Sequence, residues 1–326
     1  MHAILLAALA YLVAAMIVAG LAHGDLALVL RSTIVQANDA SGLMLWMGGR
    51  IWPFVILALL LIGYKRILAR LVPFCELIVV LAVLPIAFAM AKNAIPVLVP
   101  YYADAWLAKV DRMVHFGTDP WRIAHAITGS VAPWMIAVYT NYWVTFAAAF
   151  PAIVLLTDRN DARLRRYAWL FLLSWIVIGN FMALAGSSVG PVFYDRLLGG
   201  DRFAGLGAAL AQSGLTQTPI GWMQDWLWQR YNEDPVTRGL GISAFPSMHV
   251  AIASMVAMYL YERSVFLGAL GAAFLAVVFF LSVYTGYHYA LDGYASILAV
   301  LGLNMTLKRY LTAQPHEMMQ HRTAAS

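Results

Sequence analysis

Residues 265–284 read VFLGALGAAFLAVVFFLSVY, a run of 20 residues without a charged side chain. A helix needs about 20 mostly apolar residues to cross the hydrocarbon core of a bilayer. The whole chain has this character, since 62% of its 326 residues are hydrophobic, 11% are charged and the mean hydropathy is +0.75. Soluble domains carry about 25% charged residues, so the composition excludes a soluble globule, and its apolar content excludes disorder. We therefore predict an all-α polytopic membrane protein.

Eight segments are long and apolar enough to be membrane spans. They lie at about 3–22, 43–64, 71–91, 131–157, 167–186, 244–261, 265–284 and 288–307. Gly48, Gly49 and Arg50 interrupt the second one near its start. The first lacks a basic region before it and is long for a signal peptide, so we expect a retained helix.

Lysine and arginine in the short loops predict the orientation of these spans. The loops at 65–70, 158–166 and 262–264 and the start of the tail at 308–309 all carry basic residues. If the eight spans hold, all four lie on one side, which is assigned to the cytoplasm. Both termini are then cytoplasmic.

The two long segments on the non-cytoplasmic side are 92–130 and 187–243. Residues 101–129 mix apolar and charged side chains at helical spacing, which predicts one or two interfacial amphipathic helices. Trp222 and Trp226 lie one helical turn apart, so we expect a second surface helix at headgroup depth. The alternative for both segments is a simple aromatic belt.

His288 and Asp292, in GYHYALDGY, are the first pair that points to chemistry. Their i, i+4 spacing places both side chains on one helix face. A carboxylate that accepts a hydrogen bond from one imidazole nitrogen fixes the tautomer and leaves the other nitrogen as a nucleophile. Ionisable groups at membrane depth are costly and mark functional sites. The alternative is a structural pair near the membrane surface.

His249 lies in GISAFPSMHVAIA, where Ser, Pro and Gly predict a turn that leads into a helix. Free N–H groups and the positive end of the dipole make a helix N-terminus an anion site, and Ser247 adds a hydroxyl. The alternative is a capping turn with an incidental histidine. Because the sixth and eighth spans both begin outside, His249, His288 and Asp292 are expected at one face and one depth.

Two histidines and a carboxylate beside a helix N-terminus suit phosphoryl transfer. One imidazole attacks phosphorus and the other protonates the departing oxygen, while N–H and guanidinium groups stabilise the equatorial oxygens. This chemistry needs no metal or cofactor. His115, His125 and the other histidines show no ligand spacing with carboxylates or with the single cysteine, so a zinc site is not expected.

PSMH at 246–249, followed by HYALD at 288–292, resembles two motifs of the type-2 phosphatidic acid phosphatase superfamily. The resemblance covers roughly residues 71–307 and implies a six-helix membrane core that binds phosphate at its outer end. It divides the chain into N-terminal transmembrane helices at 1–70, a catalytic core at 71–310 and a cytoplasmic tail at 311–326.

The resemblance also implies roles for five residues. His288 is expected to be the nucleophile that forms a phosphohistidine, and Asp292 to activate it. His249 is expected to be the general acid for the leaving group. Ser247 and the backbone around Met248 are expected to hold phosphate oxygens.

The sequence departs from the family pattern in two places. The third motif of the family has a Ser-Arg pair where this chain has Leu281 and Ser282. The first motif has a Lys followed by Arg-Pro, and the stretch GSSVGPVFYDRLLGGDRF after the fifth span contains no Lys. Arg196, Arg202 and Arg238 are candidate replacements as phosphate ligands. The alternative for each arginine is a headgroup contact or a surface charge.

Both departures are shared by the inositolphosphotransferase branch, which includes fungal inositol phosphorylceramide synthase. The resemblance to this branch therefore implies a phosphotransferase that moves a phospho-headgroup from a lipid donor to a second lipid alcohol. A phosphatase acting on phosphatidate or a polyprenyl phosphate, with water as acceptor, is the alternative. A lipid transporter or scaffold is a third hypothesis, but no internal repeat is visible. The spread of basic residues among short loops argues against nucleic acid as a partner.

Overall fold

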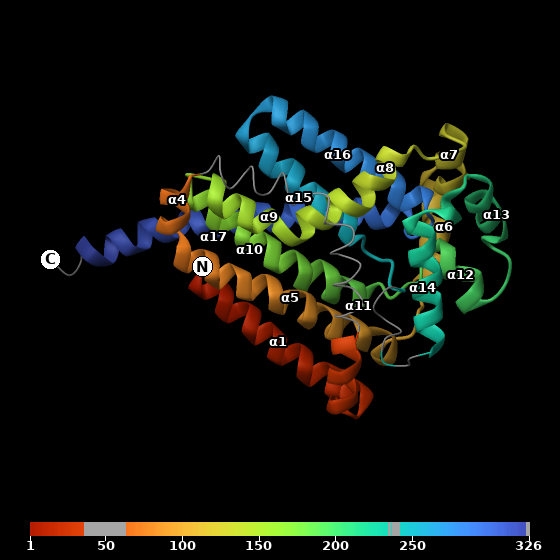
Figure 1. Cartoon of the computed structure of the whole chain (residues 1–326), viewed down its shortest axis with the longest axis horizontal. Helices are drawn as coiled ribbons and strands as arrows, with labels where there is room; N and C mark the ends of the chain where they lie inside the picture. Colours follow the sequence, from red (N-terminus) through yellow and green to blue (C-terminus); the bar gives the residue numbers. More distant parts are fainter. Residues whose placement is uncertain (36–62, 234–235, 237–241, 324–326) are drawn as a thin grey trace.

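The computed structural model describes residues 1–35, 63–233, 236 and 242–323. The described residues form helices and contain no strand, which confirms the all-α prediction. In Figure 1 long helices run side by side, and a group of short helices crosses one end of the bundle.

Seven stretches make up the bundle. They are α1 (His2–His23), α5 (Leu71–Leu98), α8 to α9 (Pro133–Thr157), α10 to α11 (Asp161–Ala185), α15 (Met248–Arg263), α16 (Val265–Tyr284) and α17 (Ala290–Thr323). Two of them contain π-helical turns, at Val138–Tyr142 and Ser174–Met182. The short α4 (Tyr64–Ala69) precedes α5.

Six described helices are long and apolar enough to cross a membrane, so the protein is a multi-pass membrane protein by length and composition. They match six of the eight predicted spans. The predicted span at 43–64 lies, apart from its last two residues, outside the described residues. The predicted span at 244–261 is the shorter helix α15, which begins at Met248 because Pro246 and the capping Ser247 precede it.

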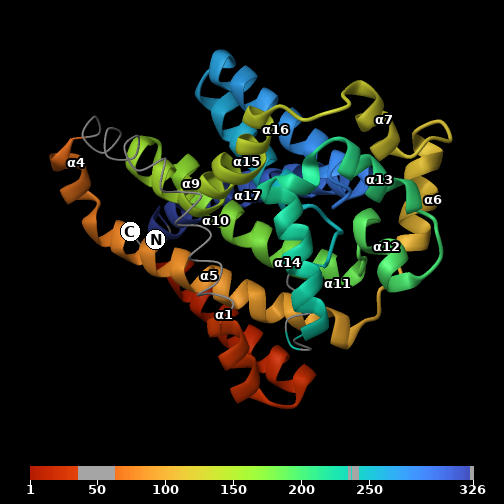
Figure 2. The same ribbon diagram turned by 45° about the vertical axis from the view of Figure 1, so that its right-hand side comes forward.

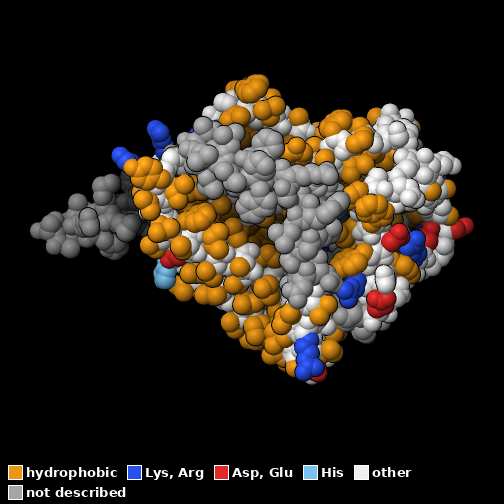
Figure 3. Space-filling model, in the orientation of Figure 1, with side chains coloured by type: hydrophobic (Ala, Val, Ile, Leu, Met, Phe, Trp, Pro, Cys, Tyr) orange, Lys and Arg blue, Asp and Glu red, His pale blue; other side chains and the backbone are white. Residues whose placement is uncertain are grey.

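The surface of the bundle matches a membrane environment. Figure 3 shows hydrophobic side chains over most of the visible face of the long helices, with charged side chains gathered toward the ends. Large apolar residues such as Ile17, Val79 and Leu298 are exposed on the outside of these helices. Lipid tails, rather than protein, are expected to cover them.

Helix α15 lies at the centre of the bundle, where Val250 to Val256 are buried. It packs against α16, α17, α9 and α10. A Cβ at Gly271 of α16 would lie 2.7 Å from the Cα of Ala257, so this glycine permits a close approach of the two helices. The position of His249, in the first turn of α15, is therefore fixed by the core.

The short helices at one end are α6 (Asp104–Val114), α7 (Pro120–Ile127), α12 (Pro191–Leu198), α13 (Ala204–Gln212) and α14 (Pro219–Glu233), with a 3-10 turn at Leu215–Gln217. We call them the surface helices. The sequence predicted helices in 101–129 and one around Trp222, and the structure has both. Helices α12 and α13 were not predicted, since glycines break this stretch into short pieces.

The N-terminus and the C-terminal part of α17 lie at the end of the bundle opposite the surface helices, as Figures 1 and 2 agree. The predicted placement of both termini at one end thus matches the helix arrangement. Which end faces the cytoplasm stays a prediction.

Candidate functional site

His288 and Asp292 form the predicted pair where the loop after α16 enters α17. The Nδ1 atom of His288 lies 3.2 Å from Oδ2 of Asp292. The backbone N–H of Tyr289 donates to the same oxygen at 3.1 Å. Asp292 is fully buried, and its Oδ1 has no hydrogen-bond partner among the described residues. With Nδ1 engaged by the carboxylate, Nε2 is the ring nitrogen left for chemistry.

The environment of His288 keeps the imidazole neutral. Burial, together with the positive charge of Lys92, lowers the pKa of His288 to about 3. A neutral imidazole has the lone pair that a nucleophile needs.

His249 faces His288 from the first turn of α15, with 6.4 Å between the ring centroids. Its ring stacks on Tyr139, 4.5 Å between centroids, and on Trp143, 3.9 Å. The indole N–H of Trp143 donates to the backbone oxygen of His249 at 3.0 Å. Two imidazoles far apart in the sequence thus meet at one end of the bundle, as predicted.

Ser247 and Met248 form the turn that leads into α15. The Ser247 hydroxyl oxygen accepts a hydrogen bond from the N–H of Val250 at 3.4 Å, so Ser247 is the N-cap of the helix. The Ser296 hydroxyl donates to the backbone oxygen of Ser247 at 2.9 Å. Met248 is buried beside Gly179. These contacts fix the turn, and a role in phosphate binding stays a prediction.

Lys92 is a site residue that the sequence analysis missed. It lies near the C-terminal end of α5, only 7% exposed, and its charge acts on both His249 and His288. Within the described parts of the chain Lys92 makes no hydrogen bond or ion pair, and its Nζ lies 5.3 Å from the ring centroid of Phe88. A buried unpaired cation is costly, which makes Lys92 a candidate anion ligand.

The length of α5 and a short sequence pattern both point to Lys92. The predicted span ended at residue 91, which placed the lysine in an outer segment, whereas α5 continues to Leu98 and leaves it inside the helix. The motif with a Lys followed by Arg-Pro was also expected after the fifth span. Val99 and Pro100 lie seven and eight residues after Lys92, so this stretch resembles that motif with valine in place of arginine.

Asp104, at the start of α6, holds the backbone beside the site. Its carboxylate accepts hydrogen bonds from the N–H of Val189 at 2.9 Å, the N–H of Gly190 at 3.0 Å and the hydroxyl of Tyr289 at 2.9 Å. Burial is the main cause that raises the pKa of Asp104. This carboxylate ties the 187–190 loop to the residue after His288.

Asp111 lies two turns further along α6 and caps α17. It accepts hydrogen bonds from the N–H groups of Ala290 at 3.2 Å and Leu291 at 3.1 Å. A carboxylate at a helix N-terminus stabilises the helix dipole. Burial raises the pKa of Asp111 to about 6. Through Asp104 and Asp111, helix α6 therefore holds the three residues that lie between His288 and Asp292.

The loop that carries His288 is also fixed from the other side. Leu281 and Ser282, which stand where the family has Ser-Arg, are both buried at the end of α16. The backbone oxygen of Ser282 accepts from the N–H of His288 at 3.1 Å. Gly190 has a φ of +80°, and a Cβ there would overlap the backbone oxygen of Tyr287, so glycine permits this close approach.

Of the three predicted phosphate-binding arginines, the structure describes Arg196 and Arg202, and each of them contacts another side chain. Both carboxylate oxygens of Asp119 accept hydrogen bonds from Arg202, one of them at 2.9 Å. The guanidinium of Arg196 lies over the ring of Trp228, at 5.2 Å. Arg238 lies outside the described residues. Phosphate binding by these arginines stays a prediction.

Among the residues that the structure describes, no group of three or more His, Cys, Asp or Glu side chains has the arrangement of a metal site. The site consists of imidazole, carboxylate and ammonium groups, which is the set that acid–base and nucleophilic chemistry uses.

A family model described as the PAP2 superfamily matches residues 105–305, which is more than half of the chain. The chain belongs to the PAP2 superfamily. Its members are generally phosphatases or phosphotransferases. The match includes His249, His288 and Asp292, and Lys92 lies before it. Neither curated proteins nor solved structures gave a match. Membership and the apolar helices together support a lipid phosphatase or phosphotransferase type of function.

Proposed function

We propose that this protein is a membrane phosphotransferase that acts on a lipid phosphate or a phospho-headgroup lipid through a phosphohistidine at His288, as in the inositolphosphotransferase branch. The observation that carries the proposal is the meeting of two imidazoles, 6.4 Å between centroids, with a carboxylate behind one of them. A tetrahedral phosphorus between the two rings is within reach of both.

In the first step Nε2 of His288 attacks phosphorus and forms a P–N bond, and the bond between phosphorus and the leaving oxygen breaks. The leaving oxygen takes a proton from His249. Asp292 accepts the Nδ1 hydrogen bond of His288 and stabilises the positive charge that develops on the ring. General acid catalysis of this kind contributes about 10²–10⁴-fold.

In the second step a hydroxyl oxygen attacks the phosphorus of the phosphohistidine. The P–N bond breaks, its electron pair returns to Nε2, and His249 takes the proton of the attacking hydroxyl. His249 is then ready to act as the acid again. A lipid alcohol as acceptor makes the reaction a transfer, and water makes it a hydrolysis.

Lys92 is proposed as the cation that holds the non-bridging phosphate oxygens. Its burial, its lack of an ion pair within the described chain and its action on both histidines support this role. Helix α15 begins at Met248, and its N-terminus lies at the same end of the bundle, where helix N–H groups and the positive end of the dipole favour an anion. Preorganised donors of this type stabilise the charge of the transition state.

Lys92 also favours the second candidate, a lipid phosphate phosphatase. The apparent loss of the first-motif lysine was one of two departures that placed the sequence in the transferase branch. With Lys92 as that lysine, the departures that still favour transfer are the missing arginines, at Val99 and at Leu281 and Ser282.

The test begins with the purified protein, a 32P-labelled lipid phosphate and an alkaline denaturing quench. We expect a base-stable, acid-labile phosphoenzyme that His288→Ala lacks. His2→Ala, whose side chain is exposed and lies next to Glu76 at 3.3 Å, is the control and is expected to retain the label. A label that persists in His288→Ala contradicts the proposed nucleophile.

The acceptor is tested by following the label after the donor is removed. A transferase is expected to pass it to an added lipid alcohol faster than to water. Release as inorganic phosphate at a rate that is independent of added alcohol would assign the protein to the phosphatases.

A further inference from the structure

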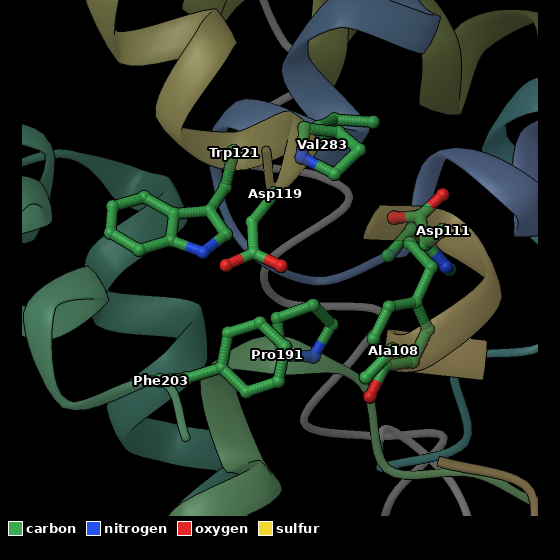
Figure 4. Close-up of a pocket in the computed structure, with 10 residues that line it drawn as sticks. Ala108, Asp111, Asp119, Trp121, Pro191, Phe203 and Val283 are labelled. Carbon is green, nitrogen blue, oxygen red and sulfur yellow. The ribbon is translucent and has the colours of Figure 1, made fainter. Parts of the chain in front are cut away.

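A cavity lies at the end of the bundle that carries the termini, between the start of α10, the end of α15 and the stretch of α17 around Lys308. Its volume is about 140 Å³, which is room for about ten water molecules. The space that Figure 4 shows among Asp119, Trp121 and Pro191, beside His288, has only about 10 Å³, which is room for about one. The larger cavity can therefore hold a group of several heavy atoms, such as a phosphate.

Positive charge predominates around this cavity. Its lining includes Asn160, Arg163, Arg166, Glu262, Lys308 and Leu311. Asp158 accepts hydrogen bonds from Arg163 at 2.8 Å and from Arg263, the neighbour of Glu262, at 3.2 Å. Of these described side chains four are cations and two are carboxylates, which leaves an excess of two positive charges. An anionic group therefore complements the cavity.

Arg166 has hydrogen-bonding capacity that the protein does not use. The residue is only 8% exposed, and its Nη2 donates to Oε2 of Glu262. Its Nε–H has no hydrogen-bond partner within the described parts of the chain. A guanidinium carries five N–H donors in a planar fork that matches the oxygens of a phosphate. One carboxylate cannot satisfy this fork, so a ligand with several anionic oxygens fits beside it.

The lipid-facing surface of α17 continues from the cavity. Met305 and Leu301 lie three and seven residues before Lys308, so they share its helix face, and both are exposed. A lipid can thus lay an acyl chain on this face and reach the cavity with its phosphate. A soluble phosphate lacks the acyl contact and meets arginines that Asp158 and Glu262 already engage. The surroundings therefore favour a lipid over a free anion.

We propose that this cavity binds the phosphate group of an anionic phospholipid from the adjacent leaflet, held by Arg166 and Lys308. Glu262 lies thirteen residues after His249 on α15, which is about 20 Å along the helix. The bound lipid is thus separate from the substrate at the histidines, and the inference does not rest on the proposed function.

The experiment is native mass spectrometry of the full chain in a neutral detergent, which measures the Kd of the first bound lipid. The probes are phosphatidylglycerol, which is anionic, phosphatidylcholine, whose ammonium balances the same phosphate, and glycerol 1-phosphate, which has no acyl chain. We expect phosphatidylglycerol to bind about tenfold more tightly than phosphatidylcholine, because of the excess positive charge. Glycerol 1-phosphate is expected to show no measurable binding.

Arg166→Gln removes the guanidinium fork, so we expect about tenfold weaker binding of phosphatidylglycerol. Lys308→Gln, at an exposed position, is expected to weaken it about fivefold and serves if Arg166→Gln fails to fold. Arg309→Gln is the matched control, because it removes the same charge from the next exposed residue of α17, about 100° around the helix. It and Lys92→Met are expected to bind as the wild type does.

Equal binding of phosphatidylglycerol and phosphatidylcholine would contradict the proposed anion selectivity. Equal losses in Lys308→Gln and Arg309→Gln would show a general attraction to basic surface instead of a defined site. Glycerol 1-phosphate that binds as tightly as the lipid would contradict a lipid ligand. A loss confined to Lys92→Met would place the lipid at the histidines and reject the site here. Since none of these results needs turnover, they leave the phosphoenzyme test of the proposed function independent.

Discussion

The two ends of the helix bundle differ in whether their buried charged groups are paired. At the end with the termini, the fully buried Asp158 is paired with Arg163 at 2.6 Å and with Arg263 at 3.2 Å. At the end with the surface helices, Lys92 has no ion pair within the described chain, and Oδ1 of Asp292 has no hydrogen-bond partner there. Paired charges hold helices together, whereas unpaired ones lower stability and are kept where a ligand completes them.

The pKa of Asp158 illustrates the paired end. Burial raises this pKa, but the hydrogen bonds from Arg163 and the charges of both arginines outweigh burial, so it is lowered. Asp111, at the other end, has a raised pKa because burial outweighs its hydrogen bonds to α17. The same residue type therefore stabilises one end and carries a cost at the other.

The largest expected effect comes from removing His249, the proposed general acid. His249→Gln removes the proton donor, so turnover of a lipid phosphate is expected to fall about 10²–10⁴-fold. The defect is expected to shrink with p-nitrophenyl phosphate, whose leaving group needs no proton. Steady-state rates with both substrates measure this. An equal loss with both would show that His249 is not the general acid.

Asp111→Asn separates the effect of Asp111 on the position of His288 and Asp292 from its effect on the stability of the fold. The raised pKa means that the stability linked to Asp111 is present below its unfolded value near 3.9 and is lost as the pH rises through about 6. At pH 7.5 the variant is thus expected to be as stable as the wild type or more so. Turnover is expected to fall about tenfold, since the N–H groups of Ala290 and Leu291 lose an ionised acceptor.

Rates and thermal unfolding at pH 5 and 7.5 check this prediction, with Asp201→Asn, an exposed carboxylate, as the control. A variant that loses stability at pH 7.5 in proportion to its activity would mean that Asp111 is only a structural cap.

The smallest effect on chemistry is expected at the paired end. Asp158→Asn removes charged hydrogen bonds, so the free energy of unfolding is expected to fall by about 2 kcal/mol, with unchanged turnover per folded molecule. The lowered pKa means that this stability is present above the unfolded value near 3.9 and is lost as the pH falls through the lower folded value.

Thermal unfolding from pH 7 to pH 3 measures the loss. Asp161→Asn is the matched control, because Asp161 is 81% exposed in its pair with Arg70 and such pairs contribute little. If the two variants are equally stable, Asp158 does not hold this end together.

The sequence predicted those parts of the site that depend on local spacing. His288 and Asp292 lie on one face because four residues separate them, and the order of the spans placed His249 at the same end. It did not predict Lys92, because that depended on where α5 ends. It also did not predict the contacts of Asp104 and Asp111, because their partners lie 85 to 185 residues away in the sequence. Local spacing carries no information about such contacts.

The most direct test of the contrast between the two ends is protection by inorganic phosphate. A ligand that binds the folded state raises its stability by about 1.4 kcal/mol at ten times its Kd. At constant ionic strength, phosphate is expected to raise the unfolding temperature of the wild type and of Lys109→Met, whose lysine is exposed on α6. It is expected to leave that of Lys92→Met unchanged. Equal protection of Lys92→Met would show that the buried, unpaired lysine does not bind phosphate.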